Sequence, residues 1–387
     1  MKNKYSLMFV SILSLGVLIG CVNKNEEKKQ EKTYVLENCS IHHDDEFGGA
    51  YIDISIADFN NIGFSFGDSV SLSFNTNGKI NEFKDIGYYS GYYVPAGQDL
   101  LVGYKGYDYI KYCINYGEDI YATNEFNLDT KVTITLFEAS KYKDVEETLS
   151  ISYSDKREEY TSDEEFANFR EVNVGNIKPK TLYRGASPID NSRKRAAIVD
   201  SLLEKNNIQY NVDLADKLEN IYVQEKYVIG DYMKDLISNN KSIFLGMAAA
   251  YKADDFSMKM KKMFLSMLNN DGPFYVHCLE GKDRTGYVCM VIEALCGATY
   301  NELIDDYFVT YKNYYGIEKG STKYEVIKEL HIDEMIRYVF SFDKETNLLG
   351  AGYYSKARAY LENIGLTNTQ IDLLQEKFSA WGVLWMS

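Results

Sequence analysis

The sequence has 387 residues, of which 45% are hydrophobic and 26% charged, and this length allows two buried cores. The formal net charge of −15 argues against a nucleic-acid partner, because no basic stripe exists to neutralise a phosphate backbone. An anionic substrate must therefore be bound by a local positive pocket.

The first twenty residues have the pattern of a targeting segment. A basic start with two lysines precedes an apolar run, Leu7–Ile19, that is too short to span a bilayer comfortably. The following LIGC at residues 18–21 resembles a bacterial lipobox, in which a small residue precedes the lipid-bearing cysteine. We expect residues 1–20 to be a lipoprotein signal peptide and Cys21 to be lipidated. An ordinary secretory signal and an uncleaved anchor are the alternatives.

Residues 21–33 are charged and lack apolar periodicity, which predicts a solvated linker. With the lipid on Cys21, the chain is expected to be anchored to the cell membrane on its extracytoplasmic face. Two acyl chains from a diacylglycerol anchor bind a membrane more firmly than one.

From residue 34 to residue 151 the pattern is that of short strands. Branched or alternating apolar runs are separated by turn residues such as Asn77–Gly78. The region is predicted to form a separate all-β domain, a barrel or a sandwich. The expected strands lie within Tyr51–Ile56, Val70–Phe74, Leu100–Tyr104 and Val132–Phe137.

Two features of this β region could carry chemistry. Cys39 and Cys113 could form a disulfide outside the membrane, or remain free thiols. The segment His42–Glu46 contains residue types that bind metals, but neighbours on one loop rarely converge on one ion. We therefore expect a solvated loop there, and no metal site.

The polar segment Ser154–Glu165 marks a boundary, after which strands alternate with helices. Residues 158–387 are predicted to form an α/β domain with a central, mostly parallel sheet flanked by helices. Strands are expected before Tyr183, at Gln209–Leu214 and at Phe274–Val276; helices are expected at Asn191–Asn206, Asp255–Asn270, Thr285–Cys296 and throughout Tyr300–Ser387.

Residues 277–286, HCLEGKDRTG, lie between an expected strand and an expected helix. Backbone N–H groups of such a loop can form a nest for phosphate oxygens, and the helix N-terminus adds positive potential. That field favours the thiolate of Cys278, which could attack a bound phosphate and form a phosphocysteine. Arg284 could bind two phosphate oxygens in bidentate fashion, and the Thr285 hydroxyl could donate to the sulfur as it leaves.

This loop resembles the HCxxGxxR[ST]G motif of the protein-tyrosine-phosphatase superfamily, and its branch of bacterial enzymes with HCxxGKDRTG. A second matching block is NFREV at residues 168–172, followed by LYRGAS at residues 182–187. The branch is similar to phosphoinositide and dual-specificity phosphatases. The resemblance extends from about Glu165 to the C-terminus and implies a cysteine-phosphatase fold without a cofactor.

The resemblance implies that Cys278 is the nucleophile and Arg284 the phosphate clamp. In lipid-active relatives the lysine at the position of Lys282 reaches a second phosphate, and the alternative is a solvated or ion-paired lysine. Asp283 is the first candidate for the general acid, unless it only caps the helix. The remaining loop residues implied in substrate binding are His277, Leu279, Glu280, Gly281, Lys282, Thr285 and Gly286.

Second-tier candidates lie outside the loop. Asp254 and Asp255 precede a helix and are alternative acids, although one of them is more simply a helix cap. Arg184 could line the pocket or belong to a structural ion pair. The sequence departs from many relatives at residues 213–215, which read DLA where those relatives have DLR.

The predicted function is hydrolysis of phosphomonoesters through a phosphocysteine, with phosphotyrosine in proteins as substrate and phosphoinositides as a further substrate class. One alternative is an inositol-polyphosphate phosphatase similar to the cysteine phytases. Another is a non-catalytic surface lipoprotein that only binds a phosphorylated ligand.

Overall fold

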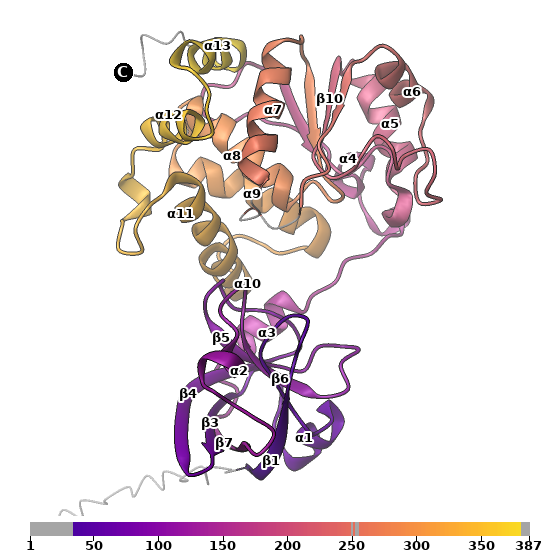
Figure 1. The fold of residues 1–387 in the computed structure, drawn as a ribbon. Coiled ribbons are helices and arrows are strands. Elements are labelled where there is room, and N and C mark those ends of the chain that lie inside the picture. Colours follow the sequence, from indigo (N-terminus) through magenta and orange to yellow (C-terminus); the bar gives the residue numbers. More distant parts are fainter. Residues whose placement is uncertain (1–33, 249–250, 252–254, 381–387) are drawn as a thin grey trace, which may run out of the picture. The chain divides into compact units, whose positions relative to one another are not determined.

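The computed structural model describes residues 34–248, 251 and 255–380 (Figure 1). The expected signal peptide, the linker at 21–33, the lipidation site Cys21 and the candidate acid Asp254 lie outside the described residues. No helix within the described residues is long and apolar enough to cross a membrane.

The N-terminal region is rich in β structure, as the sequence predicts. Its strands pair in a closed ring with the order β1-β2-β6-β5-β4-β3-β7, around a buried aromatic and aliphatic core. The pairs are antiparallel apart from β4 with β5. The elements are β1 (Val35–His43), β2 (Ala50–Ile52), α1 (Ile56–Ile62), β3 (Ser69–Thr76), β4 (Lys79–Tyr89), β5 (Asp99–Val102), β6 (Ile110–Ile114), α2 (Ile120–Thr123), β7 (Lys131–Glu138) and α3 (Lys143–Leu149).

The Asn77–Gly78 pair forms the turn between β3 and β4, with positive φ at both residues. This is the geometry that a two-residue hairpin needs. The expected strand at Tyr51–Ile56 is wrong in its second half. The chain leaves the sheet after β2, and Ser55 caps α1 by accepting a hydrogen bond from the backbone N–H of Asp58.

The segment His42–Glu46 is only in part the solvated loop that the sequence suggested: Asp45 and Glu46 are exposed in a turn. His42 and His43 complete β1, and Asp44 is buried and forms an ion pair of 2.5 Å with the buried Lys111. Burial removes both charges from water, so each requires the other. Cys39 and Cys113 are both free thiols.

The second region contains a five-stranded sheet with the order β11-β10-β12-β9-β8, in which all neighbours are parallel except β8 and β9. It is an α/β region, as expected. The strands are β8 (Arg170–Glu171), β9 (Leu182–Gly185), β10 (Tyr210–Asp213), β11 (Ser242–Phe244) and β12 (Phe274–His277). The helices and turns are η1 (Arg157–Glu159), α4 (Asp163–Phe166), η2 (Asn191–Arg193), α5 (Ala196–Lys205), α6 (Asp231–Ser238), α7 (Phe256–Leu268), α8 (Asp283–Leu295), α9 (Tyr300–Tyr315), α10 (Thr322–Ile327), the π-helical turn η3 (Lys328–Asp333), α11 (Glu334–Phe340), η4 (Leu348–Gly350), α12 (Tyr353–Asn363) and α13 (Asn368–Phe378).

Helices cover both faces of this sheet (Figure 1). The side chains of β12, which alternate between the two faces, show why. Phe274 and Val276 pack into the large core formed with α7, α8 and α9, whereas Tyr275 packs into the core formed with α5 and α6. Successive side chains of a strand point to opposite faces, so β12 needs apolar partners on both sides. The loop that follows β12 therefore starts from a strand that is fixed on both faces.

The helix expected at Asn191–Asn206 is shorter than predicted. The turn η2 ends at Arg193, the next residue, Lys194, has a left-handed backbone conformation with φ of 57°, and α5 begins only at Ala196. The short elements β8, β11 and α6 were not predicted, because they are too short to display a clear period.

Candidate active site

Strand β12 ends at His277 and helix α8 begins at Asp283, and residues 278–282 connect them. The structure therefore has the strand, loop and helix order that the sequence predicts. Cys278 follows the strand directly and is only 4% exposed. Its thiol lies at the base of a loop that leads into the N-terminal end of α8, where the helix dipole favours an anion.

The carbonyl groups of this loop are bound by donors outside it. Since a peptide unit is planar and trans, a carbonyl turned outward directs the next N–H group to the opposite side. No hydrogen-bond acceptor is found for the N–H groups of residues 279–282 within the part of the chain that the structure describes. The Leu279 carbonyl oxygen accepts a hydrogen bond of 3.1 Å from Ser187 N. The Glu280 carbonyl oxygen accepts bonds of 2.9 Å from Tyr314 Oη and 3.1 Å from Asn168 Nδ2. The Gly281 carbonyl oxygen accepts a bond of 3.0 Å from Arg184 Nη2.

This arrangement leaves a set of backbone donors without protein partners around a buried thiol. Unpaired amide groups are costly unless a ligand or water satisfies them. Successive inward N–H groups at a helix N-terminus bind phosphate and similar anions. The loop can therefore hold a tetrahedral oxyanion beside Cys278.

Gly281 is required by the path of the loop. Its φ is +69°, and a Cβ atom at this position would lie 2.2 Å from the carbonyl oxygen of Gly185. Both the backbone angle and the close approach to β9 exclude a larger residue. A Cβ atom at Gly286 would similarly lie 2.2 Å from the ring of Tyr307.

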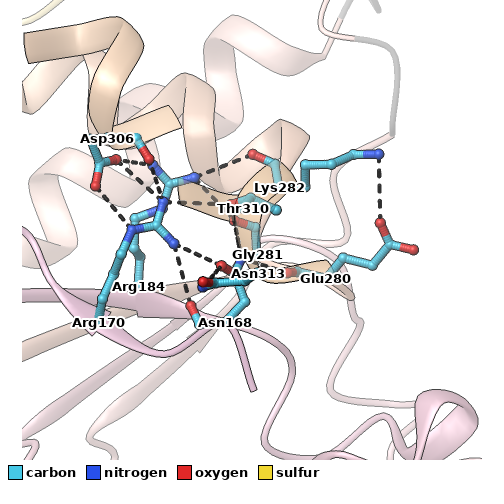
Figure 2. A network of polar contacts seen from close by, with 9 residues as sticks. All are labelled: Asn168, Arg170, Arg184, Glu280, Gly281, Lys282, Asp306, Thr310 and Asn313. Carbon is cyan, nitrogen blue, oxygen red and sulfur yellow. Dashed lines mark hydrogen bonds and ion pairs between the residues drawn. The ribbon is translucent and has the colours of Figure 1, made fainter. Parts of the chain in front are cut away.

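A buried ion-pair network holds the outer side of the loop (Figure 2). Asp306 on α9 pairs with Arg184 on β9 and, through a bond of 3.0 Å, with Arg170 on β8. Arg184 also donates to the carbonyl groups of Gly281 and Lys282. One carboxylate thus fixes two arginines, one of which binds the loop directly.

Asn168 extends this network from the other side. Its Nδ2 donates to Glu280 O and to Thr310 Oγ1 at 3.0 Å, while its Oδ1 accepts from Arg170 and Asn313 (Figure 2). Burial alone would raise the pKa of Asp306, but Arg170 and Arg184 outweigh burial and hold that pKa well below its usual range. Asp306 is therefore a permanent anion that orients both guanidinium groups.

Arg184 is 1% exposed, so its guanidinium does not line an open pocket. Of the two alternatives that the sequence left open, the structure has the ion pair. Asp255 is at the N-cap position of α7 without a capping bond from its side chain, and it forms an ion pair of 2.5 Å with Lys259. The hydrogen bond from Lys259 lowers the pKa of Asp255, which disfavours a role as proton donor.

His277 is fully buried, and its Nδ1 lies 3.2 Å from the carbonyl oxygen of Cys278. Burial lowers the pKa of His277 to about 4, so the imidazole is neutral at physiological pH. Its Nε2 lies 3.8 Å from Asp213. Burial raises the pKa of Asp213 to about 6, and burial together with Asp213 raises that of Asp216 to about 6.

Asp213 ends β10 and His277 ends the adjacent strand β12, where the two residues are paired in the sheet. The backbone N–H groups of Ala215 and Asp216 donate to Asp213 Oδ1, both at 2.9 Å. Asp213 Oδ2 and His277 Nε2 have no hydrogen-bond partner within the described residues. The next residue after Leu214 is Ala215, and alanine supplies no side-chain donor to these groups.

Arg284 and Thr285 lie in the first turn of α8. Arg284 Nη1 donates to the carbonyl oxygen of Met247 at 2.9 Å. Thr285 is fully buried, and among the residues described here its hydroxyl has no hydrogen-bond partner, that of Cys278 included. The Thr285 hydroxyl therefore remains available as a donor.

Lys282 and Asp283 lie side by side at the start of α8, with Lys282 Nζ 3.9 Å from Asp283 Oδ2. Asp283 is 56% exposed and accepts a hydrogen bond of 3.0 Å from Tyr307 Oη. Lys282 is 18% exposed and also lies 3.8 Å from Glu280 Oε2. An exposed carboxyl at the rim of the loop can exchange protons with a bound ligand or with water.

Several residues of the site were not identified from the sequence as site residues. Asn168 lies in the NFREV block, but its contact with the loop could not be inferred from that block alone. Asp306 and Tyr314 lie on α9, about 20 to 30 residues beyond the loop, where the helical pattern gives no sign of a buried charge. An aspartate on the apolar face of that helix was the available signal, because a buried carboxylate requires a partner.

We predict that Asp306→Asn lowers the free energy of unfolding by about 3–5 kcal/mol, because two buried arginines lose their counter-ion. Urea denaturation measures the change. Asp305→Asn is the matched control, since the neighbouring Asp305 is 51% exposed and pairs with an exposed lysine. The control should change stability by about 1 kcal/mol or less. Equal losses in the two variants would contradict the role of Asp306.

We predict that Asp213→Asn alters how stability depends on pH. The unfolded carboxyl loses its proton near pH 3.8, whereas in the folded chain burial holds the pKa at about 6, so this group destabilises the fold increasingly from pH 4 to pH 6. Asparagine does not titrate. The free energy of unfolding of the variant should therefore rise relative to wild type over that range, by up to about 3 kcal/mol.

Urea denaturation at pH 4, 5, 6 and 7 tests this prediction. The buried His277 has the opposite effect, because its lowered pKa makes stability rise with pH between about 4 and 6.5. His277 is present in both proteins, and the loss of the Asp213 charge lowers the pKa of Asp216, which changes the difference in the same direction as Asp213 itself. A difference that stays constant with pH would refute the prediction.

The match to a family model agrees with this geometry. A family model described as "Tyrosine phosphatase family" matches residues 164–380. No curated protein matches the chain. Among solved structures, the core catalytic domain of the PP-IP phosphatase SIW14 from S. cerevisiae, in complex with citrate, is 21% identical, with 44% of this chain and 90% of that chain covered and a TM-score of 0.26. TpbA from P. aeruginosa is 16% identical, with 54% and 94% covered and a TM-score of 0.22.

Similarity at these TM-scores supports no conclusion about substrate. The family model, by contrast, spans more than half of the chain and includes the whole loop together with Asn168, Arg184 and Asp306. The chain belongs to the tyrosine phosphatase family, and it is a phosphatase of the protein-tyrosine-phosphatase type.

Proposed function

We propose that the chain hydrolyses phosphomonoesters through a phosphocysteine intermediate and that its substrate is phosphotyrosine in proteins. The observation that carries this proposal is the set of unpaired backbone N–H groups around Cys278, at the N-terminal end of α8. Such a loop binds a phosphate group with its phosphorus next to the sulfur.

In the first step the Cys278 thiolate attacks phosphorus, and the bond from phosphorus to the tyrosyl oxygen breaks. Asp283 is proposed to give its proton to that oxygen, so that tyrosine leaves as the neutral phenol. Arg284 binds the equatorial oxygens as charge shifts during transfer. In the second step water attacks the phosphocysteine, Asp283 accepts a proton from the water, and the sulfur leaves while the Thr285 hydroxyl donates to it.

His277 has a positioning role in this proposal. It is neutral, it is fully buried, and its Nδ1 lies next to the Cys278 carbonyl group. We infer that it fixes the orientation of the first loop peptide and does not act as a base. The mechanism requires no metal, so activity should survive EDTA.

Phosphotyrosine is preferred over more highly charged substrates because the loop carries little excess positive charge. Its two cations, Lys282 and Arg284, are balanced by Glu280 and Asp283. The chain as a whole carries −15. Phosphoinositides remain a second substrate class in this proposal.

The proposed location is the extracytoplasmic face of the cell membrane, with Cys21 as the lipid-bearing residue. This proposal rests on the sequence of residues 1–33 alone. Two further parts of the proposal depend on this location: that the chain is attached to the membrane, and that its substrates are surface or host phosphoproteins.

We predict that the wild type hydrolyses p-nitrophenyl phosphate in a vanadate-sensitive reaction and that Cys278→Ser abolishes this activity, by at least about a thousandfold. Serine keeps the size of the side chain but is far less nucleophilic than a thiolate. A spectrophotometric assay measures the rate, and thermal unfolding of the variant confirms that it is folded. Phosphopeptide binding without turnover by the wild type would instead favour the non-catalytic alternative.

We predict that Asp283→Asn slows hydrolysis of a phosphotyrosine peptide about tenfold to a hundredfold more than that of p-nitrophenyl phosphate. A poor leaving group depends on protonation, whereas p-nitrophenol does not. Single-turnover kinetics on both substrates measure the ratio. Equal losses on both substrates would argue against Asp283 as the acid and in favour of Asp254, Asp255 or a structural role. Tyr307→Phe is the control, because it removes only the hydrogen bond to Asp283.

A further inference from the structure

Glu280 connects the active-site loop to a segment that precedes the residues matched by the family model. Its Oε1 accepts a hydrogen bond from Tyr153 Oη, and Arg193 Nη2 lies 3.7 Å from the same oxygen. Its other oxygen, Oε2, lies 3.8 Å from Lys282 Nζ, as Figure 2 shows. The carboxylate is thus oriented on one side and pairs with the loop lysine on the other.

Residues 153–160, here called the strap, are fixed against the catalytic region. The ring of Tyr153 stacks on Tyr314 at a centroid distance of 4.5 Å and an interplanar angle of 14°. Asp155 pairs with Arg195 at 2.7 Å and with Arg193 at 3.2 Å. Tyr314 also binds the carbonyl of Glu280, so strap and loop share a partner.

Lys282 is the positive group of the loop itself that lies next to Glu280, and its charge is already balanced. The ammonium lies between the carboxylates of Glu280 and Asp283, at 3.8 and 3.9 Å. It also lies over the rings of Tyr311 and Tyr315, at 5.6 and 5.8 Å from their centroids. Burial opposes the charge, but Asp283 and the two tyrosines, followed by Glu280, outweigh it and hold the pKa of Lys282 well above its usual value.

We expect this arrangement of charges to weaken the binding of a substrate that carries a second phosphate beside the reacting one. Its added charge would approach a lysine that is already paired, and two carboxylates that repel it. The single phosphate of other substrates is bound by the backbone donors and Arg284, and no second phosphate is present to approach Glu280. The local charge therefore discriminates by the number of phosphate groups.

We propose that Glu280, oriented by Tyr153, is a specificity-determining residue that limits the loop to substrates without a second phosphate next to the scissile one. This inference rests on the proposed function and narrows its substrate class from phosphomonoesters in general to singly phosphorylated groups such as phosphotyrosine. Phosphoinositides with adjacent phosphates are disfavoured for the wild type.

The test compares kcat/KM for a phosphotyrosine peptide and for a short-chain phosphoinositide with two adjacent phosphates. In the wild type the peptide should be preferred. Glu280→Gln keeps the shape of the side chain and an acceptor for Tyr153, but removes the charge. It should reduce the preference about tenfold, and Glu280→Gln combined with Lys282→Met should restore most of it, because the released lysine is then absent.

Two variants in the strap separate the orientation of Glu280 from the general stability of the strap. Tyr153→Phe removes the bond to Glu280 and should reduce the preference about threefold. Tyr160→Phe removes a hydrogen bond of 2.7 Å to the carbonyl oxygen of Ser154 in the same strap, without touching Glu280. It should leave the preference unchanged.

Three outcomes would overturn the proposal: a preference that changes less than twofold in Glu280→Gln, an equal change in Tyr160→Phe, or a change that persists without Lys282. Hydrolysis of p-nitrophenyl phosphate by the wild type separates this inference from the proposed function. Absence of that activity refutes the proposed function itself, whereas normal activity with unaltered preference in Glu280→Gln refutes only the role of Glu280.

Discussion

The geometry of the active-site loop depends on one buried carboxylate, Asp306. Two arginines from neighbouring strands would each be costly in the interior, and Asp306 neutralises both at once. Because Arg184 also donates to the Gly281 and Lys282 carbonyl groups, the charge of Asp306 determines where the loop can lie. The negative charge that makes the interior tolerate arginine thus supports a site that binds anions.

The position of this network explains how a chain with net charge −15 can bind phosphate. The donors offered to the ligand are backbone N–H groups, which carry no formal charge, and Arg184 lies on the carbonyl side of the same peptides. In the proposed function an anion is bound by oriented dipoles together with Arg284, and the overall field matters little. Acidic residues can then lie next to the loop, as Glu280 and Asp283 do, and under our proposal they select which anions bind.

The sequence was sufficient for the local part of this site, because strand, loop and helix are contiguous between Phe274 and Leu295. Each of them has its own signal: an apolar run, a glycine that must adopt positive φ, and a buried helix. The partners of the loop could not be predicted in the same way. Asn168, Arg184 and Asp306 come from segments separated by up to 138 positions, and only the fold brings them together.

The β-rich region shows the same limit. The Asn77–Gly78 turn could be predicted because its geometry is encoded in two residues. The early end of β2 is likewise local, since Ser55 caps α1, but the branched residues around it favoured a strand. The burial of Asp44 depended on Lys111, a partner 67 positions away, and no short window of sequence contains both.

The hydrogen bond between Arg284 and the main chain has a consequence for the entropic cost of binding a ligand. A free arginine side chain samples many rotamers, and fixing it on binding has an entropic cost. Here the Met247 carbonyl accepts a hydrogen bond from Nη1 in the ligand-free chain, so the orientation of the guanidinium is already restricted. Part of the side-chain entropy that Arg284 would lose on binding a phosphate is therefore already lost on folding. Under our proposal, the segment that contains Met247 thus favours binding through Arg284.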